Sequence, residues 1–342
     1  MIIDTRKNLN TPHALNSGVD IFLTLTPLHQ IFVTSLLSSN HFTNSAQIVI
    51  NMAKKSFEAD NVDVINCDFQ KRRLVDRISL YRRLARFIKN LLRDDLINSI
   101  TAPHPNCIIC NSLMFANGNH RVNILEDGLG SYYNSKNIGF IKRKSRMHVW
   151  QAPILGFSYS DYDGHFSGIN VRRMDSGFFL DPSLVYMPER FNKLCKLNLN
   201  ISSSPPRLDK GHRLLVLDQN IESVLRPEHC KEMRKKMYDY VNSYRSERII
   251  LKRHPAIHSG LNVNAFKQRL EEVDPSDAAE LTAMVYSPTI VLSFFSSALA
   301  NIKRMMPHVE CIAIMPEKYN KDETALCQIK SCFDNMGVEI LR

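Results

Sequence analysis

Two adjacent carboxylates followed by a glycine are the first residues of this sequence with an evident chemical use. Glu126 and Asp127 come directly after the apolar run Val122–Leu125 and before Gly128. A carboxylate at this place can take the proton of an attacking hydroxyl group, and the glycine permits a tight turn and close approach of a ligand. Adjacent side chains at a strand end point to opposite sides, so at most one of the two faces a cleft. The alternative is an ordinary acidic turn.

A histidine in a basic turn is the second candidate. The turn reads Lys252-Arg253-His254-Pro255 and follows the apolar run Ile249–Leu251. The proline prevents the strand from continuing, and the two cations make the turn positive. His254 can donate to a phosphate oxygen and protonate it as it leaves. A surface loop is the alternative, since His104-Pro105 repeats the dipeptide with no adjoining basic residue.

Two serines form the third candidate. Ser296 and Ser297 follow the apolar run Thr289–Leu292 and begin a helical pattern. Serine is a good N-cap residue. The N-terminus of a helix presents free N–H groups and positive dipole to an anion. These serines therefore either bind a phosphate or cap the helix without a ligand.

A basic helical pattern extends from Lys71 to Arg93. It contains nine basic residues and one acidic residue, Asp76, and its apolar residues recur at spacings of three and four. Such a helix can lie on an anionic membrane surface. The alternative is a helix packed on the core with a solvated basic face. Nucleic acid is not an expected partner, because no zinc-finger or RNA-recognition pattern is present.

The elements that position these residues alternate between strand and helix. Predicted strands are Val19–Leu25, Ala46–Met52, Val62–Cys67, Cys107–Cys110, Val122–Leu125, Leu214–Leu217, Ile249–Leu251, Thr289–Leu292, Cys311–Ile314 and Val338–Leu341. Helical patterns lie between them, including one at Ala265–Glu272, whereas residues 150–200 look irregular. This alternation predicts an α/β fold with parallel sheets. The Ser- and Pro-rich stretch 202–206 predicts two domains, 1–205 and 206–342.

Composition and missing motifs exclude several classes of protein. The chain has 342 residues, 44% of them hydrophobic, and a formal net charge of +10, which favours anionic partners. No apolar run is long enough to span a membrane and no signal peptide is recognised, so we expect a cytoplasmic protein with free thiols. Cys107 and Cys110 lack a matching second pair, so no metal site is expected. The Walker, dinucleotide-binding, zincin and nucleophile-elbow motifs are absent, which argues against P-loop NTPases, common dehydrogenases, zincins and α/β hydrolases.

In chain order, the candidate residues resemble the three motifs of bacterial sialyltransferases. The motifs read Glu126-Asp127-Gly128, His254-Pro255 and Ser296-Ser297. The likeness is nearest to the lipooligosaccharide sialyltransferases of glycosyltransferase family 52. Phe294-Phe295-Ser296 with Ala298-Leu299, then a strand and Met315-Pro316, looks like that family's C-terminal stretch, and Thr24–Gln30 resembles its first strand-to-helix turn.

The resemblance implies a GT-B architecture, with two Rossmann-like domains facing each other across a cleft. It implies an inverting enzyme that moves sialic acid from CMP-sialic acid to a terminal sugar, galactose by expectation. The acceptor would be a glycan or glycolipid of the bacterial surface: lipooligosaccharide, O-antigen or capsule. No metal or other cofactor is expected, because helix-terminus donors in a basic cleft can stabilise the single phosphate. The resemblance is compatible with a cytoplasmic enzyme that associates peripherally with the inner membrane. It is also compatible with a homodimer.

The resemblance also assigns roles to residues. Asp127 would be the base, with Glu126 as the alternative, and His254 would stabilise or protonate the leaving CMP. The expected substrate- and nucleotide-binding residues are Gly128, Pro255, Ser296, Ser297, Lys252 and Arg253. Family 52 also places a base just after the first strand of the second domain, where this sequence has Asp218. Inversion puts the base opposite CMP, which favours Asp127 in the acceptor-side domain.

Two other functions fit the same residues. The chain could be another GT-B glycosyltransferase that uses a different nucleotide sugar. It could also be a non-catalytic basic protein that binds a membrane or a nucleic acid. Stabilisation of the fold by CMP, and not by UDP or GDP, separates the sialyltransferase from both alternatives.

Overall fold

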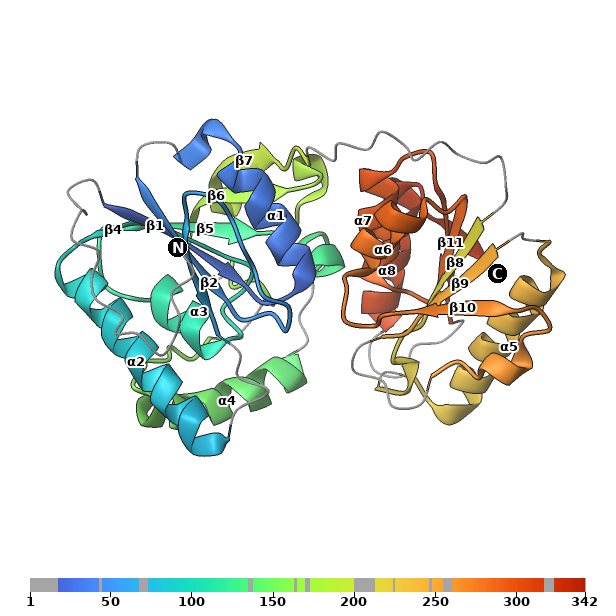
Figure 1. Ribbon diagram of the computed structural model, residues 1–342, viewed down its shortest axis with the longest axis horizontal. Coiled ribbons are helices and arrows are strands. Elements are labelled where there is room, and N and C mark those ends of the chain that lie inside the picture. Colours follow the sequence, from blue (N-terminus) through green and yellow to red (C-terminus); the bar gives the residue numbers. More distant parts are fainter. Residues whose placement is uncertain are drawn as a thin grey trace. The chain divides into compact units, whose positions relative to one another are not determined.

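The computed structural model describes residues 18–42, 45–67, 73–134, 138–162, 165–169, 173–199, 213–223, 225–245, 248–254, 260–316 and 323–341. The chain divides into two compact units, Met1–Leu199 (unit 1) and Asn200–Arg342 (unit 2). The domain boundary expected from the sequence, between residues 205 and 206, falls in a stretch outside the described residues. Each unit is a parallel β-sheet with helices on both faces (Figure 1).

Unit 1 is built on a seven-stranded sheet. Its strands are β1 (Val19–Thr24), β2 (Ala46–Asn51), β3 (Asp63–Asn66), β4 (Ile97–Ala102), β5 (Arg121–Leu125), β6 (Met174–Phe179) and β7 (Phe191–Lys196). Its helices are α1 (Pro27–Leu37), α2 (Leu74–Arg93), α3 (Ile108–Met114) and α4 (Ile138–Leu155). The strand order is β3-β2-β1-β4-β5-β6-β7, with every neighbouring pair parallel. Helix α1 covers one face, and α2, α3 and α4 cover the other (Figure 1).

Strand β1 lies inside the sheet of unit 1, between β2 and β4, and its six residues are all buried. Its one carboxylate, Asp20, accepts hydrogen bonds from Ser99 Oγ of β4, at 2.5 Å, and from Ser45 Oγ beside β2. A buried carboxylate requires such donors, because an unpaired buried charge is strongly unfavourable. Asp20 therefore ties β1 to both of its neighbours.

Unit 2 repeats the same plan with six strands. They are β8 (Arg213–Leu217), β9 (Arg248–Lys252), β10 (Leu270–Val273), β11 (Ile290–Ser293), β12 (Glu310–Ile314) and β13 (Glu339–Leu341). The helices are α5 (Pro227–Ser243), α6 (Ala279–Tyr286), α7 (Ser297–Met305) and α8 (Glu323–Met336). The order is β10-β9-β8-β11-β12-β13, all parallel. Helix α5 lies on one face, and α6, α7 and α8 lie on the other (Figure 1).

Both sheets reverse their strand order at the first strand. In unit 1, β1 lies between β2 and β4, and in unit 2, β8 lies between β9 and β11. Open parallel sheets bind ligands outside the carboxyl ends of the strands at such a switch point. The fold thus directs attention to the residues that follow β1, β4, β5, β8, β9 and β11.

The predicted α/β fold with parallel sheets is confirmed, but three local predictions were wrong. Cys107–Cys110 is not a strand; it begins α3, because a short buried apolar run fits either element. The strand at this point is β4, whose Asn98, Ser99 and Thr101 break the apolar pattern. Ala265–Glu272 is not a helix; it begins at the last residue of a 3-10 turn, Val263–Ala265, and ends in the polar edge strand β10. Residues 150–200, which look irregular, contain β6 and β7.

No helix among the described residues is long and apolar enough to cross a membrane.

We predict that Gly177→Ala in β6 destabilises unit 1. A Cβ atom at this position would lie 2.3 Å from a ring atom of Phe179 and 2.9 Å from the ring of Phe191. Both rings are buried and pack edge to face, so they cannot easily move away. We expect a loss of about 1–3 kcal/mol in the free energy of unfolding, measured by urea titration. The control Ser176→Ala should change this free energy by no more than about 0.5 kcal/mol. Equal stability of the two variants would contradict this packing.

Candidate active site

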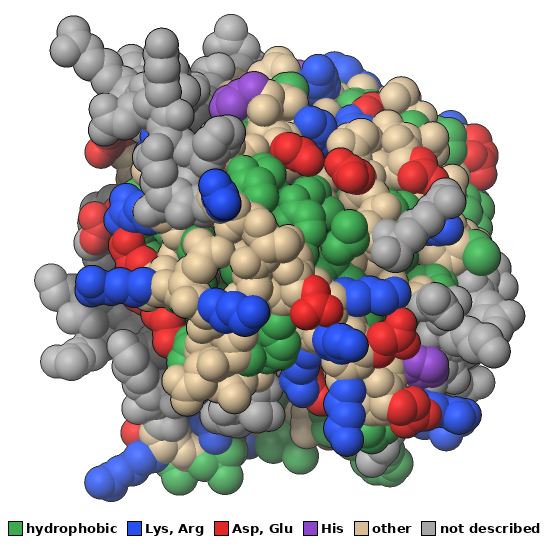
Figure 2. All heavy atoms as spheres, turned by 90° about the vertical axis from the view of Figure 1, so that its right-hand side faces the viewer, with side chains coloured by type: hydrophobic (Ala, Val, Ile, Leu, Met, Phe, Trp, Pro, Cys, Tyr) green, Lys and Arg blue, Asp and Glu red, His purple; other side chains and the backbone are tan. Residues whose placement is uncertain are grey.

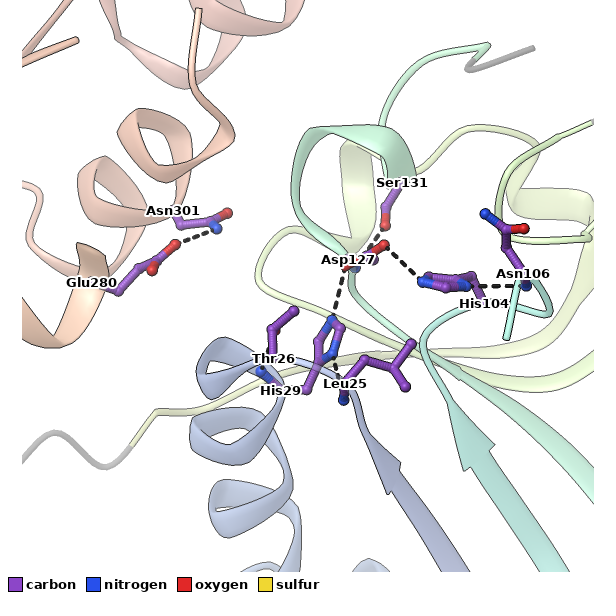
Figure 3. Close-up of polar contacts among 9 residues, drawn as sticks. All are labelled: Leu25, Thr26, His29, His104, Asn106, Asp127, Ser131, Glu280 and Asn301. Carbon is purple, nitrogen blue, oxygen red and sulfur yellow. Dashed lines mark hydrogen bonds and ion pairs between the residues drawn. The ribbon is translucent and has the colours of Figure 1, made fainter. Parts of the chain in front are cut away.

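Three neighbouring strands of unit 1 bring one carboxylate and two histidines together. Asp127 follows β5, His104 follows β4, and His29 lies in the first turn of α1 just after β1. Asp127 Oδ1 lies 2.9 Å from His29 Nε2, and Asp127 Oδ2 lies 3.6 Å from His104 Nε2 (Figure 3). Each histidine therefore faces a different oxygen of one carboxylate.

Backbone hydrogen bonds fix the tautomer of both imidazole rings. The N–H of Leu25 donates to His29 Nδ1 at 3.2 Å, and the N–H of Asn106 donates to His104 Nδ1 at 3.1 Å. Because each Nδ1 is an acceptor, the proton of each neutral ring is on Nε2, which faces Asp127. The carboxylate thus has a hydrogen bond with His29 and the Nε2 of His104 nearby, and both rings are positioned before any ligand binds.

Helix capping places His29 at this point. Thr26 is the N-cap of α1, Pro27 is its first residue, and Thr26 Oγ1 accepts from the N–H of His29 at 3.4 Å. Proline is favoured at the first helical position because its missing N–H would be unpaired there anyway. His29 has no exposed side-chain area, so this short cap orients a fully buried ring.

The surroundings of Asp127 keep it ionised. Burial acts to raise its pKa, but the hydrogen bond from His29 and the nearby His104 outweigh that effect and lower the pKa from 3.8 to about 2. The side chain nevertheless keeps 23% of its exposed area, so one side of the carboxylate is open. Asp127 is therefore a partly exposed, preoriented hydrogen-bond acceptor at neutral pH.

The adjacent carboxylate has a different environment. Glu126 has no exposed area, and its Oε2 accepts from the N–H of Leu180 at 2.6 Å and from the hydroxyl of Tyr132 at 2.5 Å. It thereby anchors the end of β5 to the turn after β6. Gly128 follows with φ +66°, a conformation that glycine adopts without strain.

In unit 2, Asp218 follows β8 and is buried. Its Oδ1 accepts from the N–H of Gln219 and its Oδ2 from the N–H of Leu261, both at 2.9 Å. A Cβ atom on Gly260 would lie 1.9 Å from Oδ2, so only glycine fits beside this carboxylate. Burial raises the pKa of Asp218, and the two backbone hydrogen bonds and the nearby Arg253 oppose that rise. Both oxygens of Asp218 thus accept backbone hydrogen bonds, Oδ2 from the 260–261 segment and Oδ1 from Gln219.

The cations of the basic turn at the end of β9 both have hydrogen-bond partners. Lys252 is buried and its Nζ donates to the carbonyl of Pro275 at 3.1 Å. Arg253 donates to Glu272 at 2.6 Å and to the carbonyl of Leu261 at 3.2 Å. His254 is half-buried. Burial lowers the pKa of His254, as does Lys252, while Asp218 acts to raise it.

Pro255, the other residue expected in this turn, lies outside the described residues.

The two serines begin α7, next to the end of β11. Ser296 is the N-cap, and its Oγ accepts from the N–H of Ala298 at 3.3 Å. Ser297 is the first residue of the helix, and both serines are partly exposed. Strands β9, β8 and β11 are neighbours, so His254, Asp218 and the serines follow the same edge of one sheet.

The histidines are the site residues that sequence reasoning missed. His104-Pro105 has no basic neighbour in the sequence, and no motif marks His29 within Thr24–Gln30. A usable signal existed, because Thr26-Pro27 predicts a helix start that puts His29 in the first turn. Among the described residues, no group of three His, Cys, Asp or Glu side chains is arranged to hold a metal ion.

Comparison with known proteins shows a likeness of fold. The sequence matches no protein-family model and no curated protein. Among solved structures, an α/β-galactoside α-2,3-sialyltransferase from the luminous marine bacterium Photobacterium phosphoreum is similar, with 12% identity and a TM-score of 0.54. The likeness covers 95% of this chain and 98% of that one.

A second solved structure, a UDP-glucose:anthocyanidin 3-O-glucosyltransferase in complex with UDP, is similar with 11% identity and a TM-score of 0.50. The likeness covers 95% of this chain and 86% of the glucosyltransferase chain. At these identities the likeness concerns the fold, which is that of the GT-B glycosyltransferases. The expected fold class and the resemblance to a bacterial sialyltransferase of GT-B type are confirmed at this level.

We predict that the two histidines hold down the pKa of Asp127. Removing a donor to the charged form raises a carboxyl pKa, so both His29→Leu and His104→Leu should raise it from about 2 toward 3.8. The effect should be larger for His29, which is nearer to the carboxylate. Carboxyl NMR titration measures the pKa, with His308→Leu on the surface of unit 2 as the control.

The lowered pKa of Asp127 determines how its contribution to the stability of the folded state changes with pH. Ionised Asp127 stabilises the folded state fully above pH 3.8, and the contribution is lost as the pH falls toward about 2. An unchanged Asp127 pKa in a folded His104→Leu variant, together with no change in His29→Leu, would contradict the proposed hydrogen bonding.

Proposed function

We propose that this chain is an inverting sialyltransferase of GT-B fold. It transfers sialic acid from CMP-sialic acid to a terminal galactose of a bacterial surface glycan or glycolipid. The observation that carries the proposal is Asp127, a partly exposed carboxylate oriented by two histidines at the switch point of unit 1. The order of the three motifs, the sialyltransferase-like fold and the net charge of +10 support it.

In this proposal Asp127 is the base for the acceptor hydroxyl. The acceptor oxygen bonds to the anomeric carbon of the donor, the bond from that carbon to the phosphate oxygen breaks, and CMP leaves with the electron pair. The acceptor hydroxyl becomes strongly acidic as its oxygen gains the new bond. A carboxylate of low pKa is therefore sufficient to take the proton, and its low pKa keeps it ionised throughout the physiological range.

Unit 2 supplies the groups for the donor. The N-terminus of α7 offers backbone N–H groups, the positive end of the helix dipole and the hydroxyls of Ser296 and Ser297 to the phosphate. His254 follows β9, which is separated from β11 by β8 in the same sheet, and it donates to the phosphate as CMP leaves. Because one phosphate carries little charge, these donors serve in place of a metal ion, and the proposed reaction uses no cofactor.

The geometry of Asp218 favours a supporting role over that of a base. Its two oxygens are occupied by backbone N–H groups, and it holds the 260–261 segment beside Arg253. Lys252 is likewise committed to the carbonyl of Pro275. We therefore assign both to shaping the donor side rather than to proton transfer.

The test of the proposed function combines nucleotide binding with turnover. CMP should raise the thermal unfolding temperature, whereas UDP and GDP should not, because the cytosine-specific contacts are then missing. The full chain incubated with CMP-sialic acid and galactose-terminated acceptors should release CMP and form a sialylated product detectable by mass spectrometry. Stabilisation by UDP or GDP alone would instead support a glycosyltransferase with another donor.

We predict that Asp127→Asn nearly abolishes transfer and leaves CMP affinity within a few-fold. The amide keeps the shape of the side chain but cannot take the proton, and general bases contribute about 10²–10⁴-fold. Asp218→Asn, the matched carboxamide change in unit 2, should be milder or should weaken donor binding. Steady-state kinetics and calorimetry with CMP separate these effects. An inactive Asp218→Asn beside an active Asp127→Asn would reverse the assignment.

We predict that CMP binding raises the pKa of His254. In the free protein burial lowers this pKa, so the ring is mostly neutral at pH 7. A bound phosphate favours the charged imidazolium, and the resulting proton uptake prepares His254 to protonate the leaving group. Histidine NMR titrations with and without CMP give the shift, with the His254→Gln spectrum assigning the signal. A His254 pKa that CMP leaves unchanged would remove this residue from the phosphate site.

A further inference from the structure

Helix α2 has an exposed stripe that is basic along most of its length. The helix carries six basic residues and one acidic residue, Asp76. Its buried face, with Leu80, Leu84 and Leu91, packs on unit 1. The opposite stripe consists of exposed residues at helical spacing: Val75, Ser79, Arg82, Arg86, Lys89 and Arg93. Arg83, on the flank, is only partly exposed.

Helix α4 has an exposed apolar stripe. Met147, Trp150 and Ile154 recur at spacings of three and four, so they share one face of the helix. Their exposed fractions are 48%, 81% and 57%. Large apolar side chains exposed together are uncommon on a free surface and indicate a site of interaction. Trp150 is the only tryptophan of the chain.

The two stripes meet where α4 ends. Arg82 Nε donates to the carbonyl of Ile154 at 3.0 Å. A surface pocket of about 250 Å³ lies there, lined by Arg82, Ala85, Arg86, Lys89 and Gly156. Gly156 has φ +88°, and a Cβ atom on it would lie 3.2 Å from the Cβ of Ala85, so a glycine lets the chain turn closely against α2. Three cations thus surround a pocket beside the exposed apolar stripe.

The cations of this face differ from those of unit 2. Figure 2 shows a face on which basic and acidic side chains are interspersed. In unit 2, Lys236 pairs with Glu232 at 3.1 Å and Arg248 pairs with Glu271 at 2.5 Å. In the part of the chain that the structure describes, Arg82, Arg86 and Lys89 form no ion pair with a carboxylate. Arg93, at the end of the stripe, pairs with Asp94 at 2.9 Å. Arg82, Arg86 and Lys89 are therefore the uncompensated positive charges of the α2 stripe.

We propose that the α2–α4 face binds the surface of an anionic phospholipid bilayer. Arg82, Arg86 and Lys89 bind headgroup phosphates at the pocket, and Met147, Trp150 and Ile154 enter the boundary between headgroups and acyl chains. Basic residues beside apolar and indole side chains are the combination that such a boundary favours. The sequence alone predicts that the basic helix α2 can lie on an anionic membrane. The structure adds the exposed apolar side chains of α4 and the pocket.

The single tryptophan makes the test direct. Vesicles of phosphatidylglycerol and phosphatidylcholine, added to the full chain at low salt, should shift the fluorescence emission of Trp150 to shorter wavelength. Vesicles of phosphatidylcholine alone should not do so. Added salt should reverse the shift, because it screens the attraction of the basic stripe. No emission shift with the anionic vesicles would overturn the proposal.

Two sets of variants separate the charged and apolar parts in a vesicle sedimentation assay. Arg82→Gln with Arg86→Gln and Lys89→Gln should lower partitioning about a hundredfold, since each basic residue near an anionic surface contributes about fivefold. Trp150→Ser with Ile154→Ser should also lower it, while leaving the charge unchanged. The matched control removes three exposed cations of unit 2, Lys231, Lys235 and Lys267, and should bind as wild type does. Circular dichroism confirms the fold of each variant.

A soluble polyanion distinguishes a bilayer from another anionic partner. Two results together would show that the face is a general polyanion site and that the proposal is wrong. Heparin or RNA would bind as tightly as the vesicles do, and the Trp150→Ser, Ile154→Ser variant would sediment with vesicles as wild type does. Loss of vesicle binding in both sets of variants, with weak binding of the polyanion, supports it. These assays contain no donor or acceptor, so their outcome does not depend on the proposed transferase activity.

Discussion

The hydrogen bond between His29 and Asp127, with His104 at the second carboxylate oxygen, is the constraint on which the site of unit 1 depends. Each imidazole accepts a backbone hydrogen bond at Nδ1, so each has its Nε2 proton directed at the carboxylate. The arrangement requires β1, β4 and β5 to be neighbours, because one partner follows each strand. Asp20, which ties β1 to both sides, and Glu126, which anchors the end of β5, are buried carboxylates that maintain this order. Asp20 and Glu126 thus have structural roles, whereas Asp127 keeps a partly exposed carboxylate.

The two units divide the chemistry that the proposed reaction needs. In unit 1 the switch point presents an ionised acceptor of hydrogen bonds, and in unit 2 it presents donors: the N-terminus of α7, its serines and His254. An attacking hydroxyl needs the first kind of group and a departing phosphate needs the second. The two pKa shifts agree with this division, since the surroundings of Asp127 favour its charged form and burial favours the neutral form of His254.

Much of this organisation could be predicted from the sequence, and the failures have physical causes. Buried central strands such as β5, β8 and β11 are short apolar runs, so the sequence predicts where they end. Strand β4 contains polar residues that bond within the sheet, and β10 is a polar edge strand, so neither shows an apolar run. The roles of His29 and His104 depend on which strands are neighbours, which no local pattern contains. The same limit applies to Glu126 and Asp127, because only the packing of Tyr132 and Leu180 shows which of the two is buried.

The most direct measurement of the central claim is chemical rescue of the missing base. Asp127→Ala leaves a space beside His29 and His104 in which a small carboxylate can take the place of the side chain. We predict that this variant transfers sialic acid from CMP-sialic acid very slowly and that added formate restores the rate in a concentration-dependent way. Asp218→Ala, treated identically, should show no restoration. Rescue of Asp218→Ala with none for Asp127→Ala would contradict the account and place the base in unit 2.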